Sequence, residues 1–193
     1  MHIAIEGIDG AGKTETARLL AKKRGFMFIE KPLHYILDQA GMDNYLRMSQ
    51  YINNHLDRNF TGMFYGLGNY YLSKELARKK GDIVTDRHLC STYFWNQDAD
   101  NEQFFDFLVK ICGLPDVTIL LFTDQRVRQE RIARRNPDDP DLLNKILPNS
   151  CYGKMLEFMK RYHVRYYLVD NSHMTLEETV DRIDTLISED FYG

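Results

Sequence analysis

Short apolar runs alternate along the chain with longer segments in which apolar and polar residues mix. The apolar runs are of strand length and lie at residues 2–5, 26–30, 82–86, 116–122 and 165–170. Between them, the spacing of apolar residues predicts helices over 15–25, through most of 35–80 and over 175–187. Apolar strands separated by helices indicate a parallel sheet that is covered on both faces. The pattern therefore predicts a three-layer α/β fold with a five-stranded parallel sheet.

The composition is that of an ordinary globular protein. Of the 193 residues, 44% are hydrophobic and 27% are charged, which fits a single domain with a sizeable core. The net charge of −3 argues against the nucleic-acid backbone as the main partner, because that backbone attracts a basic surface. No targeting segment or membrane span is recognisable, and the three scattered cysteines lack metal-ligand spacing. We therefore expect a soluble cytoplasmic protein that binds neither membranes nor nucleic acids.

A glycine-rich bend follows the first predicted strand, in the segment IEGIDGAGKTET at residues 5–16. The segment fits G-x-x-x-x-G-K-[ST] between a strand and a helix, the context in which this motif cradles phosphates. Glycine angles let successive backbone N–H groups point inward, and the helix that follows adds its positive end. The lysine of such a motif neutralises the β- and γ-phosphates, and the next hydroxyl ligates Mg²⁺. The bend predicts a nucleoside triphosphate site made of Gly7, Gly10, Ala11, Gly12, Lys13, Thr14 and Glu15, with Thr14 as the metal ligand.

The third predicted strand ends in VTDRH, at residues 84–88. Asp86 is placed to hold the magnesium shell, and Arg87 can form a two-pronged contact with a phosphate. An acid for the metal beside a cation for an anionic acceptor suits transfer between two phosphate-bearing substrates. The sequence has neither the guanine-reading Asn-Lys-x-Asp of GTPase switches nor the paired acids of motor ATPases. It therefore favours a phosphotransferase with Lys13, Asp86 and Arg87 as catalytic residues.

Three segments together resemble the thymidylate kinase family, whose members are P-loop kinases of nucleoside monophosphates. The segments are IEGIDGAGKTET, TDRHLCST and LPDVTILLF, and their order and spacing match over most of the chain. The resemblance implies a P-loop NTPase fold, ATP as phosphoryl donor, Mg²⁺ as cofactor, dTMP as acceptor and a homodimer. It also implies that Asp9, a carboxylate inside an anion-binding loop, accepts a hydrogen bond from the 3′-hydroxyl of the acceptor sugar.

The same resemblance implies an acceptor pocket formed by two helices. On the first of them, Phe64 matches an aromatic residue that stacks on the acceptor base. After the DRH segment, Ser91 and Thr92 match small polar residues that read the pyrimidine edge. Trp95 matches an aromatic residue that packs beneath the sugar. All four residues are therefore expected to contact the acceptor.

The helix expected over 60–81 has two further features. One face is apolar and is expected to pack mainly in the core, with Phe60, Phe64, Leu67 and Tyr71 spaced along it. Three glycines each cost about 1 kcal/mol relative to alanine inside a helix, so they indicate close approach of a ligand or another backbone: Gly62, Gly66 and Gly68. At Gly68 the family usually carries an arginine directed at the base, so the sequence leaves thymine specificity open.

Two charges that follow the second predicted strand support different acceptors. Lys31 is a cation that suits the phosphate of a monophosphate. Glu30 suits a deoxynucleoside kinase, in which a carboxylate takes the proton of a neutral 5′-hydroxyl. We expect both residues at the acceptor site. A deoxynucleoside kinase, and a nucleotide-binding relative without catalysis, stay as alternatives to a monophosphate kinase.

Five arginines lie close together in the segment DQRVRQERIARRNPDDPD, at residues 124–141. The resemblance implies a lid over about 124–150 that closes on the site and excludes water. It also implies that this lid supplies the cation that stabilises the transferring phosphoryl group, because the phosphate loop has no arginine of its own. The candidates are Arg131, Arg134 and Arg135, among which the sequence does not choose.

Overall fold

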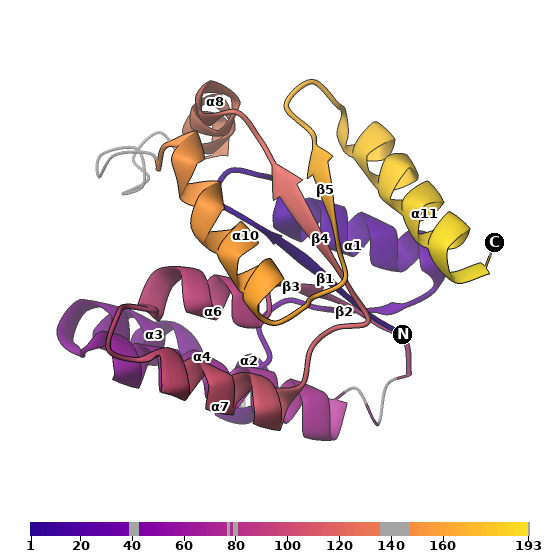
Figure 1. Cartoon of the computed structure of the whole chain (residues 1–193). Helices are drawn as coiled ribbons and strands as arrows, with labels where there is room; N and C mark the ends of the chain where they lie inside the picture. Colours follow the sequence, from indigo (N-terminus) through magenta and orange to yellow (C-terminus); the bar gives the residue numbers. More distant parts are fainter. Residues whose placement is uncertain (39–42, 77, 79–80, 136–146, 193) are drawn as a thin grey trace.

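The computed structural model describes residues 1–38, 43–76, 78, 81–135 and 147–192. Five strands form one parallel sheet in the order β2-β3-β1-β4-β5 (Figure 1). The strands are β1 (His2–Gly7), β2 (Met27–Ile29), β3 (Ile83–Asp86), β4 (Val117–Phe122) and β5 (Tyr166–Asp170). The five predicted strands and their parallel arrangement are confirmed.

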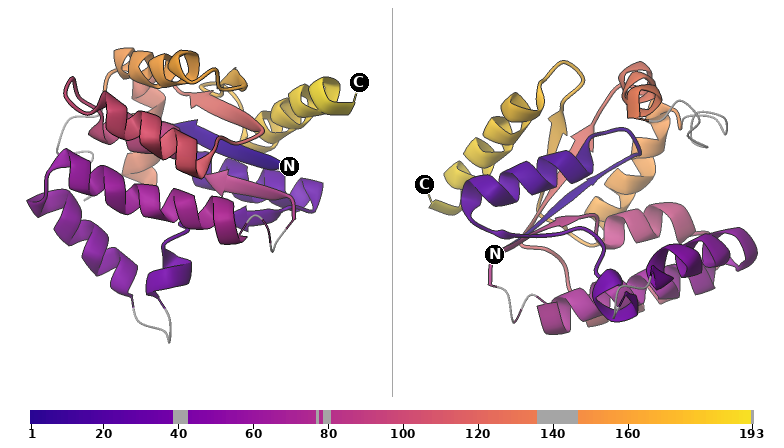
Figure 2. Two further views of the ribbon diagram at one scale, coloured as in Figure 1. Left: turned by 60° about the horizontal axis from the view of Figure 1, so that its bottom comes forward. Right: turned by 180° about the vertical axis from the view of Figure 1, so that it is seen from behind.

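Helices cover both faces of the sheet, so the three-layer α/β architecture is also confirmed (Figures 1 and 2). α1 and α11 pack on one face and α6 and α10 on the other. None of the described helices is both long and apolar enough to cross a membrane. The α-helices are α1 (Lys13–Arg24), α2 (His34–Leu37), α3 (Asn44–His55), α4 (Arg58–Tyr71), α6 (Leu89–Asn96), α7 (Glu102–Cys112), α8 (Gln125–Arg135), α10 (Tyr152–Arg161) and α11 (Leu176–Tyr192).

The central position of β1 determines where the candidate site lies. β1 is paired with β3 on one edge and β4 on the other, with Ile5 opposite Asp86 and Gly7 opposite Leu121. The glycine-rich bend that follows Gly7 therefore emerges beside the carboxyl ends of two other strands. In open parallel sheets, this edge is where ligands bind.

A smaller group of helices extends from the sheet below α6 in Figure 1. α2, α3 and α4 are joined by an apolar cluster of their own, made of Leu33, Tyr45, Ile52 and Phe64. α4 begins at an N-cap aspartate, Asp57, whose carboxylate accepts a hydrogen bond from the Phe60 backbone N–H at 2.9 Å. This group of helices forms one side of the cavity described below.

The helix expected over 60–81 differs from the prediction in extent and in orientation. α4 ends at Tyr71 and continues as one π-helical segment, η2 (Leu72–Leu76). The predicted core face is wrong at Phe60 and Leu67, which are 54% and 50% exposed, while Phe64 is buried as expected. Apart from Phe64, the buried side of α4 carries small or polar residues: Thr61, Gly62, Gly66, Gly68 and Asn69.

The packing around the glycines of α4 explains why its buried side holds small residues. A Cβ at Gly62 would lie 2.9 Å from the Phe104 ring, and one at Gly66 would lie 2.8 Å from the Leu108 side chain. At Gly68, a Cβ would lie 3.0 Å from Leu33. The close approach expected at these positions is present, but it is made by side chains of α7 and of the segment before α2. Among the residues that the structure describes, no second backbone is a near neighbour of these glycines, and Gly68 also lines the cavity described below.

Candidate active site

The bend between β1 and α1 has the backbone angles that a phosphate cradle requires. Gly7, Gly10 and Gly12 have φ values of 148°, 84° and 85°, which residues with a Cβ rarely adopt. Two of them also touch neighbouring backbone. A Cβ at Gly7 would lie 2.8 Å from the Leu121 carbonyl oxygen, and one at Gly10 would lie 2.9 Å from that of Arg128. The loop is thus held between β4 and α8, with the N-terminus of α1 behind it.

Lys13 begins α1, and its ammonium group lies inside the loop. The residue is only 6% exposed, and Nζ donates a hydrogen bond to the Ile8 carbonyl oxygen at 2.9 Å. Nζ also lies 3.6 Å from a carboxylate oxygen of Asp9. Burial, together with the nearby charge of Arg87, lowers the pKa of Lys13 to about 8. The ammonium group is therefore a desolvated positive charge in the middle of the loop, where an anion would be strongly attracted.

Asp86 and Thr14 meet beside the loop. Thr14 Oγ1 donates a hydrogen bond to Asp86 Oδ2. Asp86 Oδ1 is buried and has no hydrogen-bond partner among the described residues. A buried carboxylate oxygen without a partner is costly in the free protein, and it suits a site that a cation or its water shell completes.

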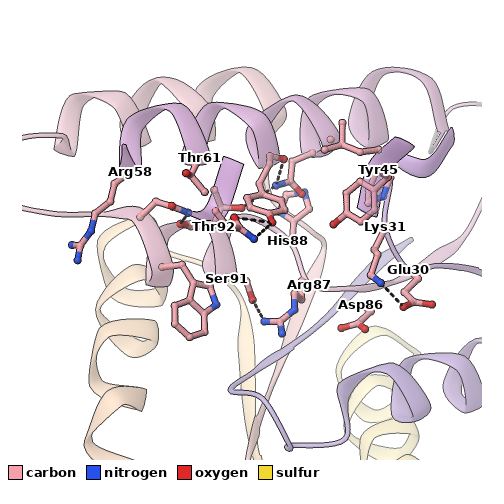
Figure 3. Close-up of a pocket in the computed structure, with 18 of the residues that line it drawn as sticks. Glu30, Lys31, Tyr45, Arg58, Thr61, Asp86, Arg87, His88, Ser91 and Thr92 are labelled. Atoms are coloured by element: carbon pink, nitrogen blue, oxygen red, sulfur yellow. Dashed lines mark hydrogen bonds and ion pairs between the residues drawn. The ribbon is translucent and has the colours of Figure 1, made fainter. Parts of the chain in front are cut away.

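Arg87 has a left-handed backbone conformation, with φ of 73°. This conformation is uncommon for an arginine and costs about 1 kcal/mol or more. The backbone N–H donates to the Ile5 carbonyl oxygen at 3.0 Å, which ties the turn to β1. In the side chain, Nη2 donates to Asp9, and Nη1 donates to Ser91 Oγ at 3.2 Å. The guanidinium group therefore joins the phosphate loop to the start of α6, and its contact with Ser91 is drawn in Figure 3.

Asp9 is held in its charged form by two cations. Burial alone would raise the pKa of its carboxyl group, but Arg87 and Lys13 outweigh burial and hold the pKa at about 2. The side chain is 32% exposed. The loop therefore presents a permanent hydrogen-bond acceptor beside its phosphate-binding cations.

Glu6 is a site residue that the sequence analysis did not single out. It is fully buried in β1 and accepts hydrogen bonds from the backbone N–H groups of His88 at 2.7 Å and Ser91 at 3.2 Å. It also accepts a hydrogen bond from the Ser91 hydroxyl. Burial raises the pKa of Glu6 to about 7. One acidic residue inside an otherwise apolar strand was the sequence signal that could have revealed it.

A cavity of about 610 Å³ opens next to Arg87, between the sheet edge and helices α3, α4 and α6 (Figure 3). Its volume suits a ligand of nucleotide size. Phe64 is not among the residues that line it. The structure brings the other predicted acceptor residues together at this cavity, along with Asp86: Asp9, Glu30, Lys31, Arg87, Ser91, Thr92 and Trp95.

Side-chain amides form much of one wall of this cavity. Asn53 of α3 donates to the Tyr65 hydroxyl at 3.0 Å. Asn69 of α4 donates to Thr92 Oγ1 at 3.4 Å, and Asn96 of α6 donates to the Thr92 carbonyl oxygen at 2.9 Å. Amides can both donate and accept, which suits the edge of a base. Asn53 and Asn69 were not predicted as site residues, although polar residues recur at helical spacing on the α4 side of Asn69.

Phe64 lies behind this wall. It is 8% exposed and packs nearly parallel to Tyr45, with ring centroids 6.3 Å apart. It also meets Tyr65 edge-on at 5.2 Å. Tyr45 and Tyr65 both line the cavity. Tyr45, Tyr65 and Trp95 therefore present aromatic rings to the cavity, and Phe64 packs against the two tyrosines from behind.

A profile of the thymidylate kinase family matches residues 5–183. The chain belongs to the thymidylate kinase family. A probable thymidylate kinase of Methanocaldococcus jannaschii is 25% identical over 187 residues, covering 95% of this chain and 93% of the relative. One of Thermoplasma volcanium is 30% identical over 154 residues, covering 70% of this chain and 73% of the relative. The solved thymidylate kinase of Candida albicans has the same fold, with a TM-score of 0.69 at 16% identity over 98% of this chain and 91% of that one.

Family membership makes the protein a phosphotransferase with ATP as its donor, as the sequence resemblance implied.

The three candidate lid arginines of this kinase lie in different surroundings. Arg131 reaches the phosphate loop, where Nη1 donates to the Ala11 carbonyl oxygen at 3.4 Å and Nη2 to that of Asn171 at 3.0 Å. Arg134 and Arg135 are exposed near the end of α8. The hydrogen bond to Ala11 places Arg131 against the phosphate loop.

Arg128 of α8 is buried and holds the backbone on either side of this helix. It is 1% exposed, and it donates from Nε to the Thr123 carbonyl oxygen at 3.0 Å and from Nη2 to that of Leu147 at 2.6 Å. These contacts tie α8 to Thr123, which precedes it, and to Leu147, which lies within the expected lid segment. Residues 136–146 of the lid expected over about 124–150 lie outside the described residues.

The remaining predicted site residues of this thymidylate kinase family member lie at its surface. Glu15 is 62% exposed, and its carboxylate pairs with Arg18 at 2.6 Å. Glu30 and Lys31 form an ion pair at 3.4 Å on the rim of the cavity. Trp95 lines the cavity and is 47% exposed, so its ring is not part of the core. Both charges that follow β2 line the cavity.

Proposed function

We propose that the protein transfers the γ-phosphoryl group of ATP directly to the phosphate of a nucleoside monophosphate, dTMP, and releases dTDP and ADP. The observation that carries this proposal is the place of Arg87. Its guanidinium group lies between the phosphate loop and the nucleotide-sized cavity, in contact with Asp9 and Ser91. A fixed cation at this point suits an acceptor that already bears a negative charge.

Different residues bind the phosphoryl donor, ATP, and the acceptor nucleotide. The loop N–H groups and Lys13 bind the β- and γ-phosphates of ATP and neutralise their charge. Arg87 binds the acceptor phosphate and holds its attacking oxygen in line with the γ-phosphorus. Asp9 accepts a hydrogen bond from the 3′-hydroxyl of the acceptor sugar, which fixes the sugar over the loop. The acceptor oxygen is already anionic, so no general base is required.

Mg²⁺ fits the residues beside the loop. Asp86 offers a buried, unpartnered carboxylate oxygen, and Thr14 offers a hydroxyl next to it. Among the described residues, no group of three or more His, Cys, Asp or Glu side chains could hold a metal ion by itself. This agrees with the way Mg²⁺ binds in phosphoryl-transfer sites, through one or two protein ligands and the substrate phosphates. When bound, the ion neutralises charge on the β- and γ-phosphates.

Arg131 is the lid arginine that we assign to the transferring phosphoryl group. In the described structure its guanidinium group spans the carbonyl oxygens of Ala11 and Asn171, at the flank of the phosphate loop. Exchange of these two carbonyl contacts for a phosphoryl oxygen would require only a side-chain movement. The charge of the transferring group would then be stabilised by a cation from α8.

The test is an ADP-release assay with ATP, Mg²⁺ and a panel of acceptors. The panel contains thymidine, deoxycytidine, dTMP, dUMP and dCMP, each at the same concentrations. We expect turnover with monophosphates and highest kcat/KM with dTMP. Turnover with nucleosides alone would identify a deoxynucleoside kinase, and ATP binding without turnover on any acceptor would identify a non-catalytic relative. ADP release without an acceptor is the control for simple hydrolysis.

We also propose a homodimer that forms through α4. Four large apolar residues with exposures from 41% to 54% follow one stripe of this helix: Phe60, Met63, Leu67 and Tyr70. A stripe of this kind on a soluble enzyme is typical of a protein interface. Leu67→Glu is expected to convert a dimer to a monomer in sedimentation equilibrium, with Ser73→Glu, outside the stripe, as the matched control.

A further inference from the structure

The hydroxyl group of Ser91 is engaged by the protein on both sides. It donates a hydrogen bond to Glu6 Oε2, and it accepts one from Arg87 Nη1 at 3.2 Å. The residue is 5% exposed. A serine hydroxyl carries a single proton, and here that proton is donated in the hydrogen bond to Glu6. Ser91 therefore has no proton left to donate to a carbonyl group of a base, although it borders the cavity.

Glu6 holds the turn from which Arg87 extends. Its Oε1 atom accepts from the backbone N–H groups of His88 at 2.7 Å and Ser91 at 3.2 Å. The same side chain thus fixes both the first turn of α6 and the Ser91 hydroxyl. Burial of a carboxylate is costly, as the raised pKa of Glu6 shows. A residue that lowers stability in the central strand is expected to serve function. The hydrogen bonds of Glu6 go to His88 and Ser91, which are next to Arg87 in the chain and in contact with its side chain respectively.

The guanidinium group of Arg87 is held at both of its terminal nitrogens. Ser91 accepts from Nη1 and Asp9 accepts from Nη2. A guanidinium group has five N–H donors, so three remain for a ligand. Because the side chain is already ordered, little conformational entropy is lost when it binds an anion.

We propose that Glu6 and Ser91 are positioning residues for the acceptor phosphate: Glu6 orients Ser91, and Ser91 orients Arg87. Ser91 is then no reader of the pyrimidine edge, contrary to what the sequence resemblance implied. Discrimination between bases belongs instead to Thr92, whose Oγ1 accepts from Asn69 in the amide wall. The inference rests on the proposed monophosphate acceptor, because the chain of contacts ends on a group that binds phosphate.

The first test compares binding of dTMP and thymidine to the full-length protein by isothermal titration calorimetry without ATP. The contacts act through the phosphate. Ser91→Ala is therefore expected to weaken dTMP binding about 10-fold and to change thymidine binding less than twofold. Ser49→Ala is the matched control. It removes another buried serine hydroxyl, which donates to Leu46 within α3 and contacts neither Glu6 nor Arg87. It is expected to leave both affinities unchanged.

The second test measures coupling and base selectivity. Glu6→Gln is expected to reproduce the Ser91→Ala loss, and the double variant is expected to lose no more than the larger single loss, because the residues act in series. Ser91→Ala should lower kcat/KM by the same factor for dTMP, dUMP and dCMP. Thr92→Val should change the ratios between these acceptors. Circular dichroism checks folding, and if Glu6→Gln does not fold, Ser91→Ala carries the test.

Four results would overturn the inference. Three of them are equal loss of dTMP and thymidine binding in Ser91→Ala, multiplied losses in the double variant, and a loss in Ser91→Ala that depends on the base. The fourth is no loss at all in Ser91→Ala. Failure of the proposed function looks different, because the wild-type protein would then bind thymidine but not dTMP, or would phosphorylate no monophosphate.

Discussion

Arg87 and Asp9 form an ion pair that joins the end of β3 to the phosphate loop that follows β1. The pair lies at the border between the loop and the cavity. Each charge supports the other, because Arg87 keeps Asp9 ionised and Asp9 holds one terminal nitrogen of Arg87. Substitution of Asp9 therefore removes a contact that orients Arg87, and substitution of Arg87 removes a charge that lowers the pKa of Asp9. Control substrates and variants separate these indirect effects from direct ones.

Arg87→Ala is expected to lower kcat/KM for dTMP about 100-fold, because a charge-assisted contact with the acceptor phosphate is lost. Glu30→Gln is expected to change the same quantity less than fivefold, since no hydroxyl proton has to be removed. Steady-state assays with dTMP and with thymidine measure both effects. The reverse pattern, in which Glu30→Gln costs about 10²–10⁴ in rate with thymidine, would identify a nucleoside as the acceptor.

Asp9→Asn is expected to raise KM for dTMP about 10-fold and to leave KM for ATP within twofold of the wild-type value. The reason is the loss of a charged acceptor for the 3′-hydroxyl. The 3′-deoxy analogue of dTMP is the control substrate, since it lacks that hydroxyl. Asp9→Asn should lose little further activity with the analogue. An equal loss with both substrates would mean that Asp9 acts only through Arg87.

Lys13→Ala is expected to abolish transfer while the protein stays folded, because the β- and γ-phosphates lose their fixed cation. The pKa of Lys13 near 8 adds a pH dependence. Below pH 8 the side chain of Lys13 is mainly the charged ammonium form. Above pH 8 it is mainly the neutral amine, so ATP should bind more weakly and its binding should be accompanied by proton uptake. Calorimetric titrations at pH 7, 8 and 9, in buffers of different ionisation enthalpy, measure this uptake. Lys13→Arg stays charged and should show none.

Glu6→Gln is expected to change how stability depends on pH. The pKa of Glu6 rises from an ordinary value of 4.5 to about 7 on folding. Its contribution to stability is therefore fully present below pH 4.5 and is lost as the pH rises through 7. Glutamine does not titrate, so the variant should gain up to about 3 kcal/mol relative to wild type between pH 4.5 and 8. Urea unfolding at pH 4.5, 6 and 8 gives this difference, and a constant difference would contradict the assignment.

The parts of the structure that the sequence predicted correctly depend on residues that are close together in the chain. Strands appear as apolar runs, and the phosphate loop has a motif of fixed spacing between a strand and a helix. The orientation of α4 depends instead on Phe104 and Leu108 of α7, which fit against its glycines. No periodicity within α4 encodes that contact, so Phe60 was placed on the wrong side.

The candidate site shows the same division. Lys13, Asp86 and Arg87 could be predicted because each ends or follows a strand at one edge of the sheet. The amide wall could not, because Asn53, Asn69 and other wall residues come from separate helices and meet only through packing. The double engagement of Ser91 was equally hidden, since Glu6 is 85 residues away in the sequence.

The two halves of the site are built on parts of the molecule that should differ in protection from amide hydrogen exchange. β1 is hydrogen-bonded to a strand on each edge and carries both Glu6 and the phosphate loop, so its amide protons should be among the last to exchange. The wall formed by α3 and α4 depends on a separate small apolar cluster and should exchange sooner. We therefore expect the cavity wall formed by α3 and α4 to open more readily than the phosphate loop.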